Sequence, residues 1–132
     1  MSKNDSPLEA AEQAMFVQWL EARGLRFTAT AQSTYTTSHN QKRKNYQQGV
    51  RKGYPDLVVL IDPSKSKDGL GYYLNIEMKR LQGGVQSQEQ KDWERAINGL
   101  GSPHVQYYLC KGADAAIKVV EHYIATSVNN PF

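Results

Sequence analysis

The feature that most constrains the fold is a pair of apolar segments joined by a stretch of turn-forming residues. The first segment, Asp56-Leu57-Val58-Val59-Leu60-Ile61, is a strongly apolar strand candidate. The second runs from Tyr72 to Lys79, and residues 62–71 between them are dense in Asp, Pro, Ser and Gly. Turn residues between two strand-like runs favour a hairpin. We therefore predict two adjacent antiparallel strands in the middle of the chain.

A helix is predicted before this hairpin. Ser6 suits the N-cap, Pro7 suits the first helical position, and Glu9 completes a capping box. Gly24 is expected to end the helix. Its apolar residues recur at helical spacing: Leu8, Ala11, Met15, Phe16, Trp19 and Leu20. This stripe predicts the face that packs against the core.

The remaining segments complete one mixed α/β domain over residues 1–132. Residues 25–35 are rich in Thr, Phe and Tyr and predict a strand, whereas residues 36–54 predict a polar, basic loop with a short helical piece around Asn45. A second capping box, Ser87-Gln88-Glu89-Gln90, opens a helix to about Leu100. Residues 105–110 predict a buried strand, and residues 113–125 a final amphipathic helix. The predicted order is α-β-β-β-α-β-α, in a chain long enough for one core.

Charge is distributed unevenly along the chain, although the formal net charge is only +3. No acidic residue lies between Glu21 and Asp56. The basic residues of that stretch are Arg23, Arg26, Lys42, Arg43, Lys44, Arg51 and Lys52. The other nine basic residues face all thirteen acidic ones. Such a split predicts one positive region that can hold a polyanion such as nucleic acid, although a solvated basic loop has the same pattern.

Composition also excludes several classes. No apolar run approaches the roughly 20 residues of a membrane helix, and the polar residues 1–5 are unlike a secretory signal. The single cysteine, Cys110, excludes an internal disulfide and a cysteine zinc site. Because Cys110 lies in an apolar run, we expect a buried structural thiol. A reducing, cytoplasmic setting is expected.

The strand predicted at residues 72–79 places two charged residues side by side. Side chains alternate between the faces of a strand, so Glu77 and Lys79 share the face opposite Ile76 and Met78. In the predicted hairpin, Asp56 begins the neighbouring strand at the same edge of the sheet. Two carboxylates and an ammonium are therefore expected to converge there.

This constellation suits the hydrolysis of a phosphodiester. Carboxylate oxygens hold Mg²⁺ or Mn²⁺, which polarises a phosphate and activates water. A neighbouring lysine can orient or deprotonate the water and offset phosphate charge. The spacing alone favours a surface Glu–Lys pair with Asp56 capping a turn, so the metal site depends on the wider sequence.

Three motifs surround these residues. They are Gly53-Tyr54-Pro55-Asp56-Leu57, then Ile76-Glu77-Met78-Lys79-Arg80, and then Gly83-Gly84 followed by Ser87, Gln90 and Trp93. Together they resemble the VRR-NUC family, nucleases of the PD-(D/E)xK, restriction-endonuclease-like superfamily. The likeness covers most of the chain, including Glu12-Gln13 near the start, and leaves the basic stretch least secure. It implies a mixed sheet flanked by helices.

The resemblance also implies a role for each matching residue. Asp56 and Glu77 would be metal ligands, joined by the backbone carbonyl of Met78. Lys79 would be the catalytic lysine. Gln90 would support the site or contact the substrate, although its capping box with Ser87 explains it without catalysis.

The family uses one further glutamate from the first helix, and Glu9 and Glu12 compete for this role. Glu9 already has a structural explanation in the Ser6 capping box. Glu12 lies within the predicted apolar stripe, where a buried carboxylate is unfavourable without a partner such as a metal. This argument favours Glu12.

The expected substrate is DNA, with Mg²⁺ or Mn²⁺ as cofactor. The predicted phosphate contacts are Lys42, Arg43, Lys44, Arg51, Lys52 and Arg80. Tyr46 and Tyr54 can stack on an unpaired base or simply pack. Small members of the family are typical of phages and prophages, and some resemble Holliday-junction resolvases, so branched DNA and a homodimer are expected. A catalytically silent DNA-binding module with the same fold is the alternative.

Overall fold

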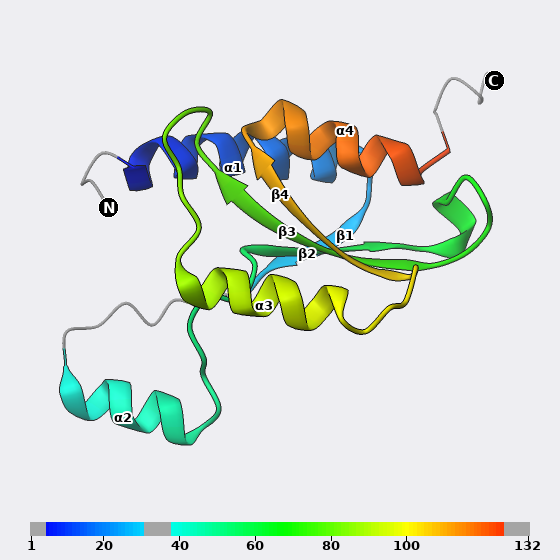
Figure 1. Ribbon diagram of the computed structural model, residues 1–132. Coiled ribbons are helices and arrows are strands. Elements are labelled where there is room, and N and C mark those ends of the chain that lie inside the picture. The colour runs from blue at the N-terminus through cyan, green and yellow to red at the C-terminus, as the bar shows by residue number, and fades with distance from the viewer. Residues whose placement is uncertain (1–4, 31–37, 126–132) are drawn as a thin grey trace.

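The computed structural model describes residues 5–30 and 38–125, with side chains from Leu8 onward (Figure 1). Its α-helices are α1 (Asp5–Ala22), α2 (His39–Gln47), α3 (Gln88–Asn98) and α4 (Ala113–Tyr123). Its strands are β1 (Arg26–Ala29), β2 (Leu57–Ile61), β3 (Tyr72–Lys79) and β4 (Val105–Lys111), and a 3-10 helix, η1, spans Pro63–Lys65. The mixed α/β class and the predicted order are confirmed, with α2 as an addition.

The four strands form one sheet in the order β1-β2-β3-β4. The predicted hairpin is present: β2 and β3 pair antiparallel, with Leu57 opposite Ile76 and Val59 opposite Leu74. After α3 crosses over, β4 pairs parallel to β3, with Lys79 opposite Lys111. The sheet is therefore mixed, and the end of β3 lies in its interior, between β2 and β4.

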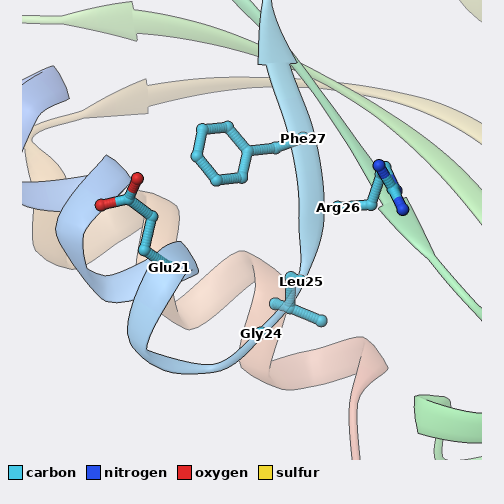
Figure 2. Close-up of a pocket in the computed structure, with 5 residues that line it drawn as sticks. All are labelled: Glu21, Gly24, Leu25, Arg26 and Phe27. Atoms are coloured by element: carbon cyan, nitrogen blue, oxygen red, sulfur yellow. The ribbon is translucent and has the colours of Figure 1, made fainter.

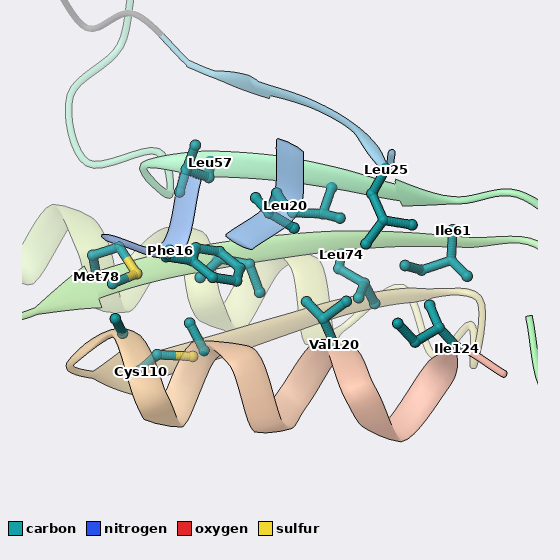
Figure 3. Packing of buried hydrophobic residues seen from close by; sticks show 14 residues of the cluster. Phe16, Leu20, Leu25, Leu57, Ile61, Leu74, Met78, Cys110, Val120 and Ile124 are labelled. Atoms are coloured by element: carbon teal, nitrogen blue, oxygen red, sulfur yellow. The ribbon is translucent and has the colours of Figure 1, made fainter. Parts of the chain in front are cut away.

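Helices cover the two faces of the sheet differently. Helices α1 and α4 pack on one face and α3 lies on the other, as Figure 1 shows. The core lies between the sheet and the α1–α4 layer (Figure 3), where Phe16 and Leu20 of α1 meet Val120 of α4 and the inward side chains of β2 and β3. Cys110 is buried in this core, and burial raises the pKa of its thiol to about 12. It is the inert structural thiol that the sequence predicts.

Alternation along β1 separates its two faces. Figure 2 shows Phe27 on the side of α1 and Arg26 on the other side of the strand. Phe27 packs against the core, whereas Arg26 is exposed. The β1–β2 part of the sheet thus has one packed face and one face that α3 does not cover.

Two expectations for the first helix were wrong. Helix α1 begins at Asp5, before the predicted N-cap Ser6; the side chain of Ser6, which the predicted capping box with Glu9 requires, lies outside those described. Leu8 and Met15 are 51% and 54% exposed, so the apolar stripe of α1 is narrower than predicted.

The short helical piece expected around Asn45 is present as the nine-residue helix α2.

The strand predicted at residues 25–35 ends at Ala29 within the described part of the chain, and residues 31–37 lie outside it. No helix among the described residues is long and apolar enough to cross a membrane.

Candidate active site

Asp56 is held in place by the turn before β2, which is packed on α3. The indole N–H of Trp93 donates to the backbone carbonyl of Lys52 at 2.9 Å, and the Trp93 ring meets the ring of Tyr54 edge-on at 4.9 Å. Gly53 has φ +89°, and a Cβ there would lie 2.7 Å from the backbone of Glu89. Only glycine satisfies both conditions, so the Gly-Tyr-Pro-Asp motif and Trp93 form one structural unit.

Asn75 strengthens this unit and was not among the predicted site residues. It is buried on the α3 side of β3, where its Oδ1 accepts a hydrogen bond from the Tyr54 hydroxyl at 2.6 Å. Its amide donates to the backbone carbonyl of Gln106 on β4. The signal in the sequence was its position, two residues before Glu77 on the same face.

Glu77 is the most deeply buried acid of the site. It is only 1% exposed, and it follows Ile76, whose partner in β2 is Leu57. Continuing that register by one residue sets Glu77 opposite Asp56. The Oε2 atom accepts from the Gln90 amide at 2.7 Å, whereas no donor among the described residues reaches Oε1. A buried carboxylate oxygen without a donor indicates a place for a proton or a cation.

The carboxyl groups of Asp56 and Glu77 perturb each other. Burial raises the pKa of Glu77 to about 9, with a further rise from the charge of Asp56, while Lys79 acts in the opposite direction. Burial also raises the pKa of Asp56, against the Met78 N–H, which donates to Asp56 Oδ2 at 2.7 Å. Two acids in this setting are both ionised only if a positive charge lies between them.

Lys79 is fixed next to this pair. Its ammonium donates to Gln90 Oε1 at 3.0 Å and lies 3.8 Å from Glu77 Oε2, and its side chain is 7% exposed. Gln90 is itself fixed, because it forms the predicted capping box with Ser87 at the start of α3. Gln90 therefore caps helix α3 and also contacts Lys79 and Glu77, so its capping role does not exclude a role in the candidate site.

The carbonyl of Met78 points to the same side as its N–H, toward Asp56, because both groups of an extended residue face one neighbouring strand. Continuing the β2–β3 register by two residues sets Pro55 opposite Met78. Proline has no N–H to donate to that carbonyl. The Pro-Asp pair thus leaves one backbone oxygen available beside the two carboxyls.

The two candidate glutamates of α1 have different surroundings. Glu12 is partly buried, and its Oε1 accepts from the Ala113 N–H at 2.7 Å, at the start of α4. The N-cap of α4 is Gly112, which has no side chain to perform this role. Glu9 lies one turn earlier, and its charge contributes to raising the pKa of Glu77. The argument that favoured Glu12 required a buried stripe that includes Leu8 and Met15, and both are exposed.

The predicted phosphate contacts lie outside this buried cluster. Lys42, Arg43 and Lys44 are on α2, which stands apart from the sheet in Figure 1 and has no buried residue. Arg51 and Lys52 follow on the exposed segment that leads to the Gly-Tyr-Pro-Asp turn. Arg80 is partly buried directly after Lys79. On α2, Tyr46 is 61% exposed, and the Arg51 guanidinium lies 3.6 Å from the centre of its ring.

The donor set fits a hard divalent cation better than a soft one. Among residues 5–30 and 38–125, no three acidic, histidine or cysteine side chains gather as a metal cluster. The carboxyls of Asp56 and Glu77 lie within hydrogen-bond range of each other, and the β-strand geometry of Met78 directs its carbonyl to the same side. Mg²⁺ is commonly held by one or two carboxylates while it keeps several waters. The unpartnered Glu77 Oε1 is consistent with this type of site.

A mixed sheet with Asp56 before one strand and Glu77 and Lys79 at the end of the next defines a protein of the PD-(D/E)xK class. The family model of the VRR-NUC domain matches residues 6–114. The chain therefore belongs to the VRR-NUC family, a nuclease-type family.

A solved structure of a VRR_NUC domain protein is 22% identical to this chain, with a TM-score of 0.63 over 89% of this chain and 88% of that one. At this identity the likeness supports the fold alone. Comparison with curated proteins gives no match.

Proposed function

We propose that the protein is a Mg²⁺- or Mn²⁺-dependent deoxyribonuclease that hydrolyses phosphodiester bonds within DNA. The observation that carries the proposal is the buried Glu77 beside the partly buried Asp56, with Glu77 Oε1 left without a donor among the described residues and Lys79 fixed alongside. The alternative, a solvent-exposed ion pair, does not fit, because the side chains of Glu77 and Lys79 are only 1% and 7% exposed.

Asp56, Glu77 and the Met78 carbonyl would hold the ion. A divalent ion bound there polarises the scissile phosphate and offsets the charge that develops on it. Glu77 must lose its proton before it can bind the ion, because burial raises its pKa to about 9. Metal affinity is therefore expected to rise with pH.

Lys79 would act on the attacking water and on the phosphate. Its ammonium donates one hydrogen bond, to Gln90 Oε1, and forms an ion pair with Glu77, so its other N–H groups can contact the attacking water or a phosphate oxygen. From that position Lys79 orients the water and offsets the negative charge on the phosphate oxygens during the in-line attack. Gln90 is a positioning residue, since it holds both Lys79 and Glu77.

The third acidic ligand would come from α1. Its electrostatic effect on Glu77 supports Glu9, whereas Glu12, favoured by the sequence argument, already accepts the N–H at the start of α4. We therefore take Glu9 as the first candidate for this ligand and Glu12 as the alternative.

The basic stretch supports DNA as the polyanion. Helix α2 and the segment after it expose five basic side chains that suit phosphate contacts, those of Lys42, Arg43, Lys44, Arg51 and Lys52. Preference for branched DNA, as in Holliday-junction resolvases, and action as a homodimer are extensions of the proposal that rest on the family resemblance.

The test is a cleavage assay on a panel of linear, nicked, flapped and four-way DNAs with Mg²⁺, Mn²⁺ or EDTA. The wild type should cut in either metal and not in EDTA. Lys79→Ala should cut at least about 100-fold more slowly, while Lys118→Ala, which removes an exposed lysine on α4, should cut normally.

A catalytically silent DNA-binding module is the second candidate, favoured by the basic stretch alone. It predicts salt-sensitive DNA binding with no cutting of any substrate in either metal. Cutting that persists in EDTA, or that Lys79→Ala does not slow, would also overturn the proposed site.

A further inference from the structure

The α3 side of the sheet has an uncovered part, next to the candidate active site. Over β1 and β2 this face is a shallow groove of about 490 Å³. Leu60 and Tyr73 are each 40% exposed there, and Val58 lies between them and the site. Large apolar side chains exposed together on one face commonly mark a binding surface.

The groove and the candidate active site are parts of one surface. Side chains of Asp56, Val58 and Leu60 follow each other on the same face of the strand, because residues alternate along it. Val58 and Leu60 therefore lie about 7 and 13 Å from Asp56 along the backbone. Tyr73 is directly opposite Leu60 in the sheet. A molecule bound at Asp56 and Glu77 that extends along β2 enters the groove.

The lining combines an apolar floor with aromatic walls and one cation. Tyr54 and Tyr73 contribute their rings, and Tyr54 is fixed by its hydroxyl bond to Asn75 and by the edge of Trp93. Arg26 lies at the other end of the groove, on the face away from α1 (Figure 2). An aromatic surface with a neighbouring arginine is the combination that stacks nucleobases in single-strand-binding proteins.

The groove is of a size that suits one small planar group: its volume is about 490 Å³, within the range of small-ligand sites. A base pair inside a duplex is stacked on both sides and cannot offer its flat face. An unpaired base can.

We infer that this groove, formed by Val58, Leu60, Tyr54, Tyr73 and Arg26, stacks an unpaired nucleobase of the strand whose phosphate lies at Asp56 and Glu77. The inference rests on the proposed function and adds to it a base-binding site, formed on β1 and β2 beside the residues that would cut the strand.

The test measures binding separately from cutting. Ca²⁺ replaces Mg²⁺, and oligonucleotides carry 2-aminopurine at successive positions of a short unpaired arm. The wild type should quench the probe at one or two adjacent positions. Tyr73→Ala should abolish that quenching and weaken binding of the arm-bearing DNA about 5- to 100-fold, without changing affinity for blunt duplex. Tyr73→Phe should restore both, because stacking needs the ring and not the hydroxyl.

Leu100→Ala is the control, since it removes an exposed large apolar side chain just after α3, outside both the groove and α2. An equal decrease in affinity for blunt-duplex and arm-bearing DNA in Tyr73→Ala, or unchanged quenching, would overturn the inference. So would a change in sedimentation showing that Tyr73→Ala dissociates a dimer, because the groove would then hold a second copy of the chain. If the wild type quenches the probe but cuts no DNA in Mg²⁺, the nuclease proposal fails and the groove stands.

Discussion

Replacing Glu77 by glutamine should make the metal-free protein more stable while abolishing its activity. The folded protein holds the pKa of Glu77 at about 9, against an ordinary value of 4.5, mainly because the side chain is buried. Below pH 4.5 the carboxyl is protonated in both the folded and the unfolded state, and it has no effect on stability through ionisation. As the pH rises above 4.5, the unfolded chain ionises and the folded chain does not, so the wild type loses stability until about pH 9.

The size of this loss follows from the shift. Each pH unit between the two pKa values lowers the free energy of unfolding by about 1.4 kcal/mol, so at pH 7 the loss is on the order of 3 kcal/mol. Glutamine is uncharged and has nearly the same shape, and its oxygen can still accept from the Gln90 amide. Its own amide can donate toward Asp56. Glu77→Gln should therefore unfold roughly 10 °C higher than the wild type at pH 7.

The assay is thermal or urea unfolding in EDTA at pH 5 and at pH 7. The stability difference between Glu77→Gln and wild type should be small at pH 5 and large at pH 7. Glu21→Gln, which neutralises an exposed acid on α1, is the control and should show no such pH dependence. Addition of Mg²⁺ at pH 7 should stabilise the wild type and not Glu77→Gln. Equal unfolding of Glu77→Gln and wild type at pH 7 would refute the reasoning that burial keeps Glu77 protonated.

Three further outcomes are expected. Glu9→Gln should weaken Mg²⁺ binding about 10-fold or more in calorimetry, with little change in melting temperature. Glu12→Ala should lower the free energy of unfolding by about 1 kcal/mol and still cut DNA. The reverse pattern would make Glu12 the ligand. Changing residues 42–44 to glutamine should reduce the slope of log affinity against log salt by about 0.9 for each phosphate that these side chains neutralise, and an unchanged slope would exclude α2 from DNA. Ser87→Ala should cost about 1 kcal/mol in urea unfolding because the helix cap is removed, and a neutral result would contradict the capping box.

The local patterns of the sequence were sufficient for the architecture. The apolar run after Asp56 and the alternation from Tyr72 to Lys79 predicted the hairpin, and Ser87 with Gln90 predicted the start of α3, because strand pairing and helix capping depend on neighbouring residues. The same alternation placed Glu77 and Lys79 on one face. These elements have their hydrogen-bond partners close in sequence, so short-range rules describe them.

The surroundings of each charged side chain were decided only by the tertiary structure. The sequence does not reveal that α3 buries Glu77 and Lys79, that Trp93 holds the backbone before Tyr54, or that Glu12 reaches the start of α4. Burial and the neighbouring charges set the pKa values of the acids, and both depend on segments that are distant in the chain. The sequence alone thus determined which chemical groups are present and at which end of the sheet they lie. Their ionisation, their partners and the uncovered groove beside them follow from packing, because packing brings together side chains whose spacing along the chain carries no signal.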